Sequence, residues 1–263
     1  MICTLGDLLL DVVVRLDGPI AEDTDTYGRS RVAPGGQAAN VAAWVAALGG
    51  NARFIGKRAD DPAGAVLTEA LGRRGVDLAG PVEESGTGTV VSVATPDGQR
   101  TMLTDRGIAP ELAPEELDAD WLAGCEWLHV AGYSLVRAPI RDAALAAAAL
   151  APRVSVDLSS TAAIDAAGVG AFRDLLERIG PQVVFANADE SALVGDLEVE
   201  TLVVKKGAGG IVVGGREYAA RPAEVLDTTG AGDALAAGFL LGGPELGLDA
   251  AARCVATMGA FPP

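Results

Sequence analysis

Short apolar runs alternate with longer Ala-rich stretches along most of this chain, and this alternation limits the possible folds more than any other feature. Residues 127–130 are strand-like and precede the helix-like residues 140–150, and residues 154–157 precede residues 171–179 in the same way. Strands that alternate with helices form mainly parallel sheets with helices on both faces, and such buried strands are continuously apolar. The pattern therefore predicts a three-layer α/β/α fold with a mostly parallel central sheet.

The other expected elements continue this alternation. We expect further strands at residues 2–5, 8–14, 53–55, 183–186, 202–205 and 211–213. We expect further helices at residues 38–48, 64–74, 231–241 and 250–258.

Residues 11–33 and 86–106 interrupt the alternation, because they are polar, β-prone and without helical periodicity. Residues 87–104 combine alternating Thr and Val with the turn Pro96-Asp97-Gly98, which predicts a β-hairpin. We expect the two segments to form a small β-strand lid over a site. Because no internal repeat or Pro/Ser-rich linker divides the sequence, we expect a single domain over residues 1–263.

The net charge and the cysteines limit which binding partners and which cellular compartment we expect. The chain has 20 Lys and Arg residues against 36 Asp and Glu residues, a net charge of −16, which disfavours nucleic acid as a partner. Cys3, Cys125 and Cys254 form no paired motif, which is typical of a reducing compartment. We expect neither a signal peptide nor a membrane partner, and hence a cytoplasmic protein.

The most informative segment runs from an apolar stretch through Gly230, Ala231 and Gly232 into an Ala- and Leu-rich helix. Glycines leave backbone amides unobstructed, and amides at a helix N-terminus attract a phosphate or a developing oxyanion. Asp233 follows in the first helical turn, where the helix dipole alone favours a carboxylate. A carboxylate beside a phosphate site can also take the proton of an attacking hydroxyl. The segment predicts phosphoryl transfer, with Asp233 as general base and the three preceding residues as anion hole.

This segment also resembles a known family. The sequence Asp227-Thr-Thr-Gly-Ala-Gly-Asp233 resembles the C-terminal signature of the PfkB carbohydrate kinases, the ribokinase-like family. Other similar segments, in the family order, are Gly6 to Asp11, Gly35-Gly36-Gln37-Ala38-Ala39-Asn40, Asp97-Gly98-Gln99-Arg100, Asn187-Ala188-Asp189-Glu190 and Lys206-Gly207-Ala208-Gly209-Gly210. The resemblance covers nearly the whole chain, whereas no P-loop or protein kinase motif occurs in it.

The resemblance implies an enzyme that moves the γ-phosphoryl group of ATP to a hydroxyl of a sugar or sugar-like molecule, with Mg²⁺ as cofactor. It implies that Asp233 is the general base and that Gly230, Ala231 and Gly232 form the anion hole, the same roles that the residues predict by themselves. It places Asn187 and Glu190 at the nucleotide phosphates, with Glu190 holding Mg²⁺ through water. The residues alone allow a second interpretation, because this spacing is also typical of a helix cap.

The resemblance also implies positions for the nucleotide and for a monovalent cation. Lys206, Gly207 and Gly210 are expected to lie along the nucleotide, although the residues alone would also fit an ordinary β-hairpin. Asp227 and Thr229 resemble positions that hold K⁺ in some members of the family, and are otherwise simply a turn.

The implied acceptor site consists of Asp11, Gly35, Gly36 and Asn40. An Asp and an Asn can bind neighbouring hydroxyls, and the glycines let a sugar ring approach the backbone. Gln37 stands where many members carry Lys or Asn, so the identity of the acceptor stays open.

Three other functions were weighed. A nucleoside kinase would be favoured by an aromatic residue in the lid, but Tyr27 is the only aromatic in the two lid segments, which favours sugars. A non-catalytic binding homologue would have lost Asp233 or the Gly-Ala-Gly run, and both are present. A dinucleotide-dependent oxidoreductase would need a Gly-x-Gly-x-x-Gly motif after the first strand, and that motif is absent there.

The remaining expectations concern the lid and the single histidine. An exposed β-sheet edge needs a partner, so we expect a homodimer formed through the lid. Arg100 and Arg106 flank the lid hairpin, and either pair with acidic neighbours or reach a carboxylate or phosphate of the acceptor. We expect His129 to be structural.

Overall fold

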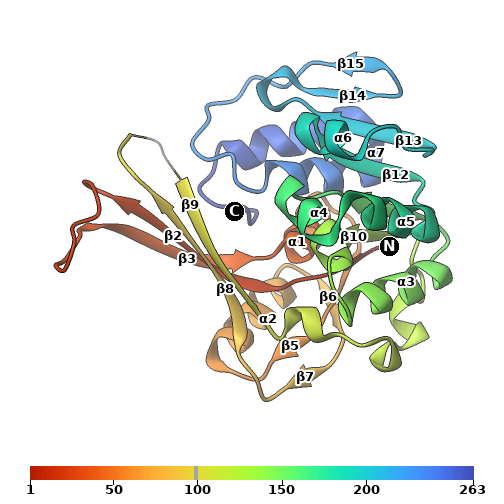
Figure 1. The fold of residues 1–263 in the computed structure, drawn as a ribbon, viewed down its shortest axis with the longest axis horizontal. Helices are drawn as coiled ribbons and strands as arrows, with labels where there is room; N and C mark the ends of the chain where they lie inside the picture. Colours follow the sequence, from red (N-terminus) through yellow and green to blue (C-terminus); the bar gives the residue numbers. More distant parts are fainter. Residues whose placement is uncertain (98–99) are drawn as a thin grey trace.

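The body of the protein is a nine-stranded sheet with strand order β15-β14-β13-β12-β11-β10-β1-β4-β6 (Figure 1). The computed structural model describes residues 1–97 and 100–263. Pairing is parallel from β6 to β13 and antiparallel between β13, β14 and β15 at one edge. The strands are β1 (Ile2–Leu5), β4 (Ala52–Ile55), β6 (Asp77–Ala79), β10 (Trp127–Ala131), β11 (Val154–Asp157), β12 (Val183–Asn187), β13 (Thr201–Lys205), β14 (Ile211–Val213) and β15 (Arg216–Tyr218).

Helices cover both faces of this sheet. The α-helices are α1 (Gln37–Ala47), α2 (Pro62–Gly72), α3 (Ile140–Leu150), α4 (Thr161–Ala167), α5 (Val169–Ile179), α6 (Ala188–Val194) and α7 (Ala231–Val255). The 3₁₀ helices are η1 (Ala109–Glu111), η2 (Pro114–Glu116), η3 (Ala119–Leu122), η4 (Gly132–Leu135) and η5 (Gly207–Gly209). Ile2 and Phe185 pack in a core cluster with α1 and α7, whereas their neighbours Cys3 and Val184 pack in a second cluster with α3 and α5. Because successive strand residues point to opposite faces, the two clusters confirm the predicted three layers.

A four-stranded sheet, which we call the lid, projects from the body (Figure 1). Its order is β3-β2-β8-β9, formed by β2 (Leu9–Leu16), β3 (Gly28–Gly35), β8 (Thr87–Ala94) and β9 (Arg100–Gly107). The two segments that interrupt the helix and strand alternation therefore meet in one sheet, through the parallel pairing of β2 with β8. A short pair, β5 (Arg58–Ala59) and β7 (Val82–Glu83), lies at its base. Gly98 and Gln99 of the predicted turn lie outside the described residues.

The end of the chain differs from the sequence prediction. The expected helices at residues 231–241 and 250–258 correspond to the two halves of α7, Ala231–Val255, which are separated by a break in helical geometry. The kink lies at Gly242 and Gly243, where Gly243 has a φ of 80°, and Pro244 starts the next turn. Proline is favoured in the first turn of a helix, so the second half begins there rather than at residue 250. In the described ranges, no helix has both the length and the apolar character needed to cross a membrane.

Candidate active site

The predicted anion hole lies at the start of α7. Gly230 has a φ of 77°, a conformation that favours glycine, and a Cβ there would lie 2.5 Å from the Cα of Ala260. The segment before α7 is held by Asp227, whose Oδ1 accepts from the backbone N of Thr229 at 3.0 Å and whose Oδ2 accepts from the backbone N of Gly259 at 3.0 Å. Asp227 and Thr229 thus form a turn that ties residues near the end of the chain to the helix N-terminus.

Asp233 lies in the first turn of α7 and is bound by α1. Asn40 Nδ2 donates to Asp233 Oδ2 at 2.8 Å. Burial raises the pKa of Asp233 to about 7, and the charges of Asp157 and Asp11 add to this rise, while the Asn40 hydrogen bond and Lys205 oppose it. Asn40 Oδ1 is buried and has no hydrogen-bond partner among the described residues. A carboxylate with this pKa can exchange a proton near neutral pH, beside an amide oxygen that can still accept a hydrogen bond.

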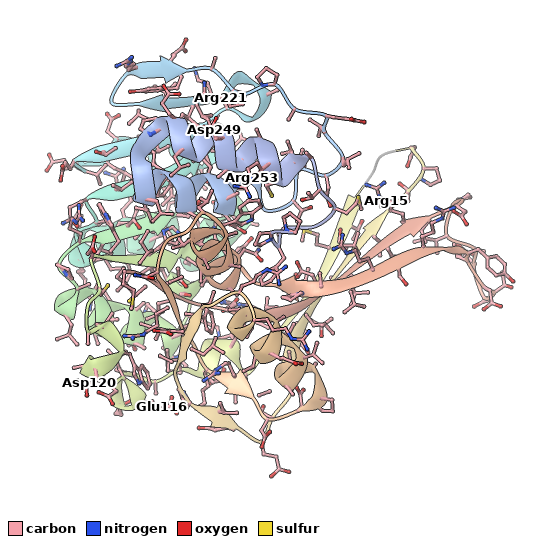
Figure 2. The ribbon with its side chains drawn as sticks, turned by 180° about the vertical axis from the view of Figure 1, so that it is seen from behind. Arg15, Glu116, Asp120, Arg221, Asp249 and Arg253 are labelled. Carbon is pink, nitrogen blue, oxygen red and sulfur yellow. The ribbon has the colours of Figure 1, made fainter. Side chains whose placement is uncertain are left out.

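A large cavity of about 670 Å³ opens beside the anion hole. Ligand sites of nucleotide size occupy about 300–1,000 Å³, so this cavity has the right volume for one. Most side chains that line it are apolar and small. The lining residues are Lys205, Gly207, Ala208, Gly210, Ala220, Arg221, Pro222, Ala223, Val225, Thr228, Ala231, Gly232, Leu235, Leu248, Ala251, Ala252 and Val255. Arg221 Nε donates to Asp249 Oδ1 at 2.7 Å on this side of the molecule (Figure 2). Because Ala231 and Val255 both line the cavity, it extends from the start of α7 to the second half of this helix.

Lys206, Gly207 and Gly210, which were expected along the nucleotide, differ in their position relative to the cavity. Gly207 and Gly210 line the cavity, and a Cβ on Gly210 would lie 2.0 Å from the carbonyl oxygen of Tyr218. Lys206 was expected beside them, but its ammonium group pairs with Glu217 on β15 at 2.8 Å and is exposed. The Lys206 side chain therefore does not line the cavity, and a contact between its backbone and the nucleotide stays a prediction.

Lys205 faces the cavity instead, and sequence analysis missed it. Lys205 Nζ donates to Asp157 Oδ2 at 2.7 Å, and the Asp157 side chain is 1% exposed. Burial alone would lower the pKa of Lys205, but the charge of Asp157 and their hydrogen bond raise it above its ordinary value. The signal for this residue was strand alternation, because β13 places Val203 in the core and hence Lys205 on the same face.

Asn187 and Glu190 form a reciprocal cap at the start of α6. Asn187 Oδ1 accepts from the backbone N of Glu190, and Glu190 Oε2 accepts from the backbone N of Asn187, both at 2.8 Å. Asn187 Nδ2 also donates to Glu190 Oε1 at 2.8 Å. Glu190 is 2% exposed, and burial raises its pKa. The cap therefore holds a buried carboxylate near Lys205 and Asp157, with which it interacts electrostatically.

The predicted acceptor residues meet where the lid joins the body. Asp11 is on β2, and its carboxylate covers Gly35, since a Cβ on Gly35 would lie 2.1 Å from Asp11 Cγ. Gly36 has a φ of 92° and precedes α1, where a Cβ would lie 2.4 Å from the carbonyl oxygen of Asp7. Gln37 Oε1 accepts a hydrogen bond from the hydroxyl of Ser159. The two glycines thus bring the Asp11 carboxylate, α1 and Asp233 together.

Arg106 connects the lid to the body through a carboxylate of the protein itself. Its Nε and Nη2 donate to the two carboxylate oxygens of Asp7 at 2.7 and 2.6 Å, and Nη1 donates to the carbonyl oxygen of Tyr133 at 3.1 Å. Of the two earlier interpretations of Arg106, pairing with an acidic neighbour is the one observed. The side chain of Arg100 lies outside the described part of the chain.

Tyr133 on η4 is a second residue that sequence analysis missed. Burial raises the pKa of Tyr133, and the charges of Glu190 and Asp233 act in the same direction, so its hydroxyl lies near the site. No motif marks this tyrosine, because a loop after β10 brings it there.

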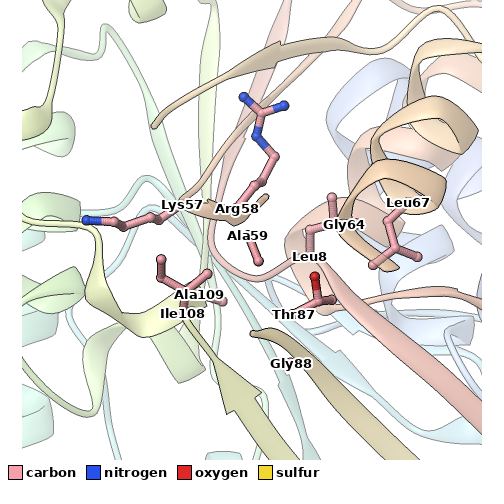
Figure 3. A pocket seen from close by; sticks show the side chains of 10 residues that line it. All are labelled: Leu8, Lys57, Arg58, Ala59, Gly64, Leu67, Thr87, Gly88, Ile108 and Ala109. Carbon is pink, nitrogen blue, oxygen red and sulfur yellow. The ribbon is translucent and has the colours of Figure 1, made fainter. Parts of the chain in front are cut away.

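Two other features do not line the large cavity. His129 is buried in β10, where its Nδ1 lies 2.9 Å from Ser155 Oγ and burial lowers its pKa to about 4. A second cavity, of about 10 Å³, lies between the base of the lid and α2 (Figure 3). It has room for about one water molecule and not for a substrate. Lys57, on its wall, binds Glu83 and Glu116.

Comparisons with known proteins agree with this geometry. The sequence matches the family described as pfkB family carbohydrate kinase over residues 1–261. It is 30% identical to a fructokinase of Escherichia coli over 93% of this chain and 84% of the relative. It is also 30% identical to an ATP-dependent ribose-1-phosphate kinase of Halopiger xanaduensis, over 91% and 83%. The fold is similar to that of adenosine kinase from Sinorhizobium meliloti, with a TM-score of 0.89, 28% identity, and coverage of 99% of this chain and 95% of that chain.

Proposed function

The chain belongs to the pfkB family of carbohydrate kinases, and we propose that it transfers the γ-phosphoryl group of ATP to a hydroxyl of an uncharged sugar. The observation that carries this proposal is the position of Asp233. Its carboxylate, with a pKa of about 7, lies at the helix N-terminus that begins beside a nucleotide-sized cavity. A base, an anion hole and a donor cavity are the parts that phosphoryl transfer to a hydroxyl requires.

On the acceptor side, Asp233 takes the proton of the attacking hydroxyl. Asn40 orients Asp233 through its amide nitrogen and offers its free Oδ1 to a second hydroxyl of the acceptor. Asp11 accepts from further hydroxyls, and Gly35 and Gly36 let the Asp11 carboxylate and the Asp7 backbone pack against the start of α1. These residues bring carboxylates and an amide, and the nearby Arg106 guanidinium is bound to Asp7, so an uncharged acceptor fits better than a phosphorylated one.

On the donor side, the cavity walls formed by Gly207 and Gly210 and by the second half of α7 hold the nucleotide. The amides of Gly230, Ala231 and Gly232 form the proposed anion hole, because the first amides of a helix have no partner within the helix. Of these three, the amide of Ala231 donates to the carbonyl oxygen of Thr228 at 3.3 Å. The role of the anion hole is to stabilise the charge of the phosphoryl group as it moves.

The residues present fit Mg²⁺ held largely by water and phosphate oxygens. In the described ranges, no group of three or more His, Cys, Asp or Glu side chains could hold a metal ion. The buried carboxylate of Glu190, set by Asn187, can hold a water molecule of a hydrated ion, which is how Mg²⁺ prefers to bind. Mg²⁺ bound with ATP neutralises charge on the β- and γ-phosphate oxygens. For K⁺, Asp227 and Thr229 are the proposed residues, and activity in K⁺ against Na⁺ buffers tests them.

A nucleoside kinase is the second candidate. The observation that favours it is Tyr133, an aromatic side chain that is 37% exposed, interacts electrostatically with Asp233 and could stack on a base. The structural similarity to an adenosine kinase points the same way.

We also propose a homodimer formed through the outer face of the lid. The pairing of β2 with β3 and β8 puts Val12, Val32 and Val91 on the face opposite Asp11, together with Leu103 of β9. Val32 is 59% exposed and Leu103 60% exposed, which is typical of a surface that pairs. Light scattering should give the mass of two chains for the wild type and of one chain for Val32→Lys. We place the protein in the cytoplasm, because all three cysteines are free and buried.

The test is ATP consumption with Mg²⁺ over a panel of pentoses, hexoses, sugar acids, phosphosugars and nucleosides, with Asp233→Asn beside the wild type. Turnover of one uncharged sugar that falls about 10³-fold in the variant supports the proposal. Turnover of nucleosides alone would establish the second candidate. Absence of turnover across the panel, in a protein that binds ATP, would contradict both.

A further inference from the structure

Lys205, the last residue of β13, and Lys206, which follows it, have opposite surroundings. Lys206 is exposed and pairs with Glu217. Lys205 lines the large cavity, and its side chain is 18% exposed. The two side chains have the same chemistry, so their environments decide which of them can act on a ligand in the cavity.

The ammonium group of Lys205 lies where the cavity meets the anion hole. Its Nζ is 2.7 Å from Asp157 Oδ2. A Cβ on Gly232, in the first turn of α7, would lie 3.5 Å from the same nitrogen. A phosphate group at the α7 N-terminus would therefore lie within reach of Lys205.

The surroundings of Lys205 are otherwise acidic. Asp157, Glu190 and Asp233 each interact electrostatically with Lys205. Three carboxylates repel a polyphosphate, and buried charges must be paired to be stable. A cation at this position can offset that repulsion at the transferring group.

We propose that Lys205 donates a hydrogen bond to the γ-phosphoryl group of ATP, and that Asp157 is the positioning residue that directs its ammonium group. This inference rests on the proposed function and adds a catalytic residue to it. The acceptor oxygen forms a bond to the γ-phosphorus, and the bond from that phosphorus to the β–γ bridging oxygen breaks. ADP leaves with the electron pair, and the hydroxyl proton passes to Asp233. Lys205 stays protonated and stabilises negative charge on the moving group.

The test compares binding of ATP and of ADP by isothermal titration calorimetry in Mg²⁺, without any acceptor. Lys205→Met should weaken ATP binding about 10- to 100-fold, the range for a lost hydrogen bond between charged groups. ADP binding should change less than about 3-fold, because ADP lacks the γ-phosphoryl group. A structural role for Lys205 would weaken both nucleotides alike.

Lys206→Met is the matched control, because it removes the same charge one residue away, outside the cavity. It should leave both affinities unchanged. The pair of substitutions Lys205→Met and Asp157→Asn covers the case in which the single variant fails to fold, since it removes both members of the buried ion pair together. The double variant should show the same selective loss of ATP binding.

The outcomes separate this inference from the proposed function. Equal losses for ATP and ADP, or no loss, would overturn the role of Lys205 while leaving the kinase proposal intact. A wild-type protein that binds neither nucleotide would overturn both. Selective loss of ATP binding in the Lys205 variants, with Lys206→Met unchanged, supports the inference.

Discussion

The proposed nucleotide side of the site consists mainly of backbone turns of the body, whereas the proposed acceptor side presents side chains from α1 and the lid. Gly230 and Gly210 have positive φ values, and a Cβ on either would overlap neighbouring backbone. Asp11, by contrast, comes from a strand of the projecting lid, and Asn40 comes from a helix of the body. A site made of tightly packed backbone tolerates no added side chain. A site made of side chains can change its ligand without a change of fold.

The largest effect should follow from adding one methyl group at Gly230, in the proposed anion hole. Gly230→Ala requires an unfavourable φ and moves Ala260 or the start of α7, so we expect kcat to fall about 100-fold for every acceptor. Steady-state kinetics with two acceptors measures this.

The matched control is Gly243→Ala in the kink of α7. Gly243 has a φ of 80°, but a Cβ there meets nothing within 4 Å, so this variant bears the same conformational cost without the collision. We expect it to lose stability while keeping kcat. Equal kcat losses in the two variants would show that the anion hole is not the sensitive feature.

The acceptor side should respond differently, with a smaller and more selective change. Asp11→Asn should lower kcat/KM for the acceptor about 10- to 30-fold, since a charged hydrogen-bond acceptor becomes a neutral one. The affinity for ATP should stay the same. Asp17→Asn, just beyond the far end of β2, is the control and should have no effect. A loss of ATP affinity in Asp11→Asn would mean that the two sides are not separate.

The pH dependence of activity should reflect both sides at once, because Asp233 lies between them. The unprotonated carboxylate is the active form, so kcat/KM should rise about tenfold from pH 6 to pH 8, with an apparent pKa of about 7. The groups facing Asp233 are Asn40 of α1, Asp11 of β2, Asp157 of β11 and Lys205 of β13.

Changes on opposite sides should move this pH profile in opposite directions. Asp11→Asn removes a negative charge that raises the pKa of Asp233, so the rise should shift to lower pH. Lys205→Met removes a positive charge that lowers this pKa, so the rise should shift to higher pH. ATP binding measured over the same pH range is the control. A flat profile between pH 6 and 8 would argue against Asp233 as the base.

The smallest effect should come from the contacts that join the lid to the nucleotide side. Arg31 Nη1 donates to the carbonyl oxygen of Met258 at 2.8 Å, and Arg15 Nη2 donates to that of Leu226 at 3.3 Å (Figure 2). Arg31→Met should raise the acceptor KM about 2- to 5-fold, the value of one exposed hydrogen bond. Arg29→Met, an exposed arginine on the same strand, should not. Equal effects would assign the change to lid charge rather than to this contact.

Much of this could be predicted from the sequence because it depends on local patterns. The alternation of apolar runs with Ala-rich stretches gave the correct layers, and the segments that interrupt it form the lid. The prediction for residues 242–249 was wrong because Gly242 and Gly243 end one helix, while Pro244 starts the next directly. The motif also did not show that the Lys206 side chain pairs with Glu217 while Lys205 lines the cavity, since a motif gives positions along the chain and not the direction of a side chain.

The sequence by itself determined most of the elements, the family and the motif that begins α7, because periodicity, glycine and helix-terminal chemistry act over a few residues. It did not indicate β6, α4, α6 or β15. Only the tertiary structure decided that Lys205 rather than Lys206 lines the cavity, that Tyr133 interacts electrostatically with Asp233, and that Arg106 is bound to Asp7. It also decided that Asp233 has a pKa of about 7. These properties depend on burial and on charges brought together from distant strands, and such long-range contacts leave no local pattern in the chain.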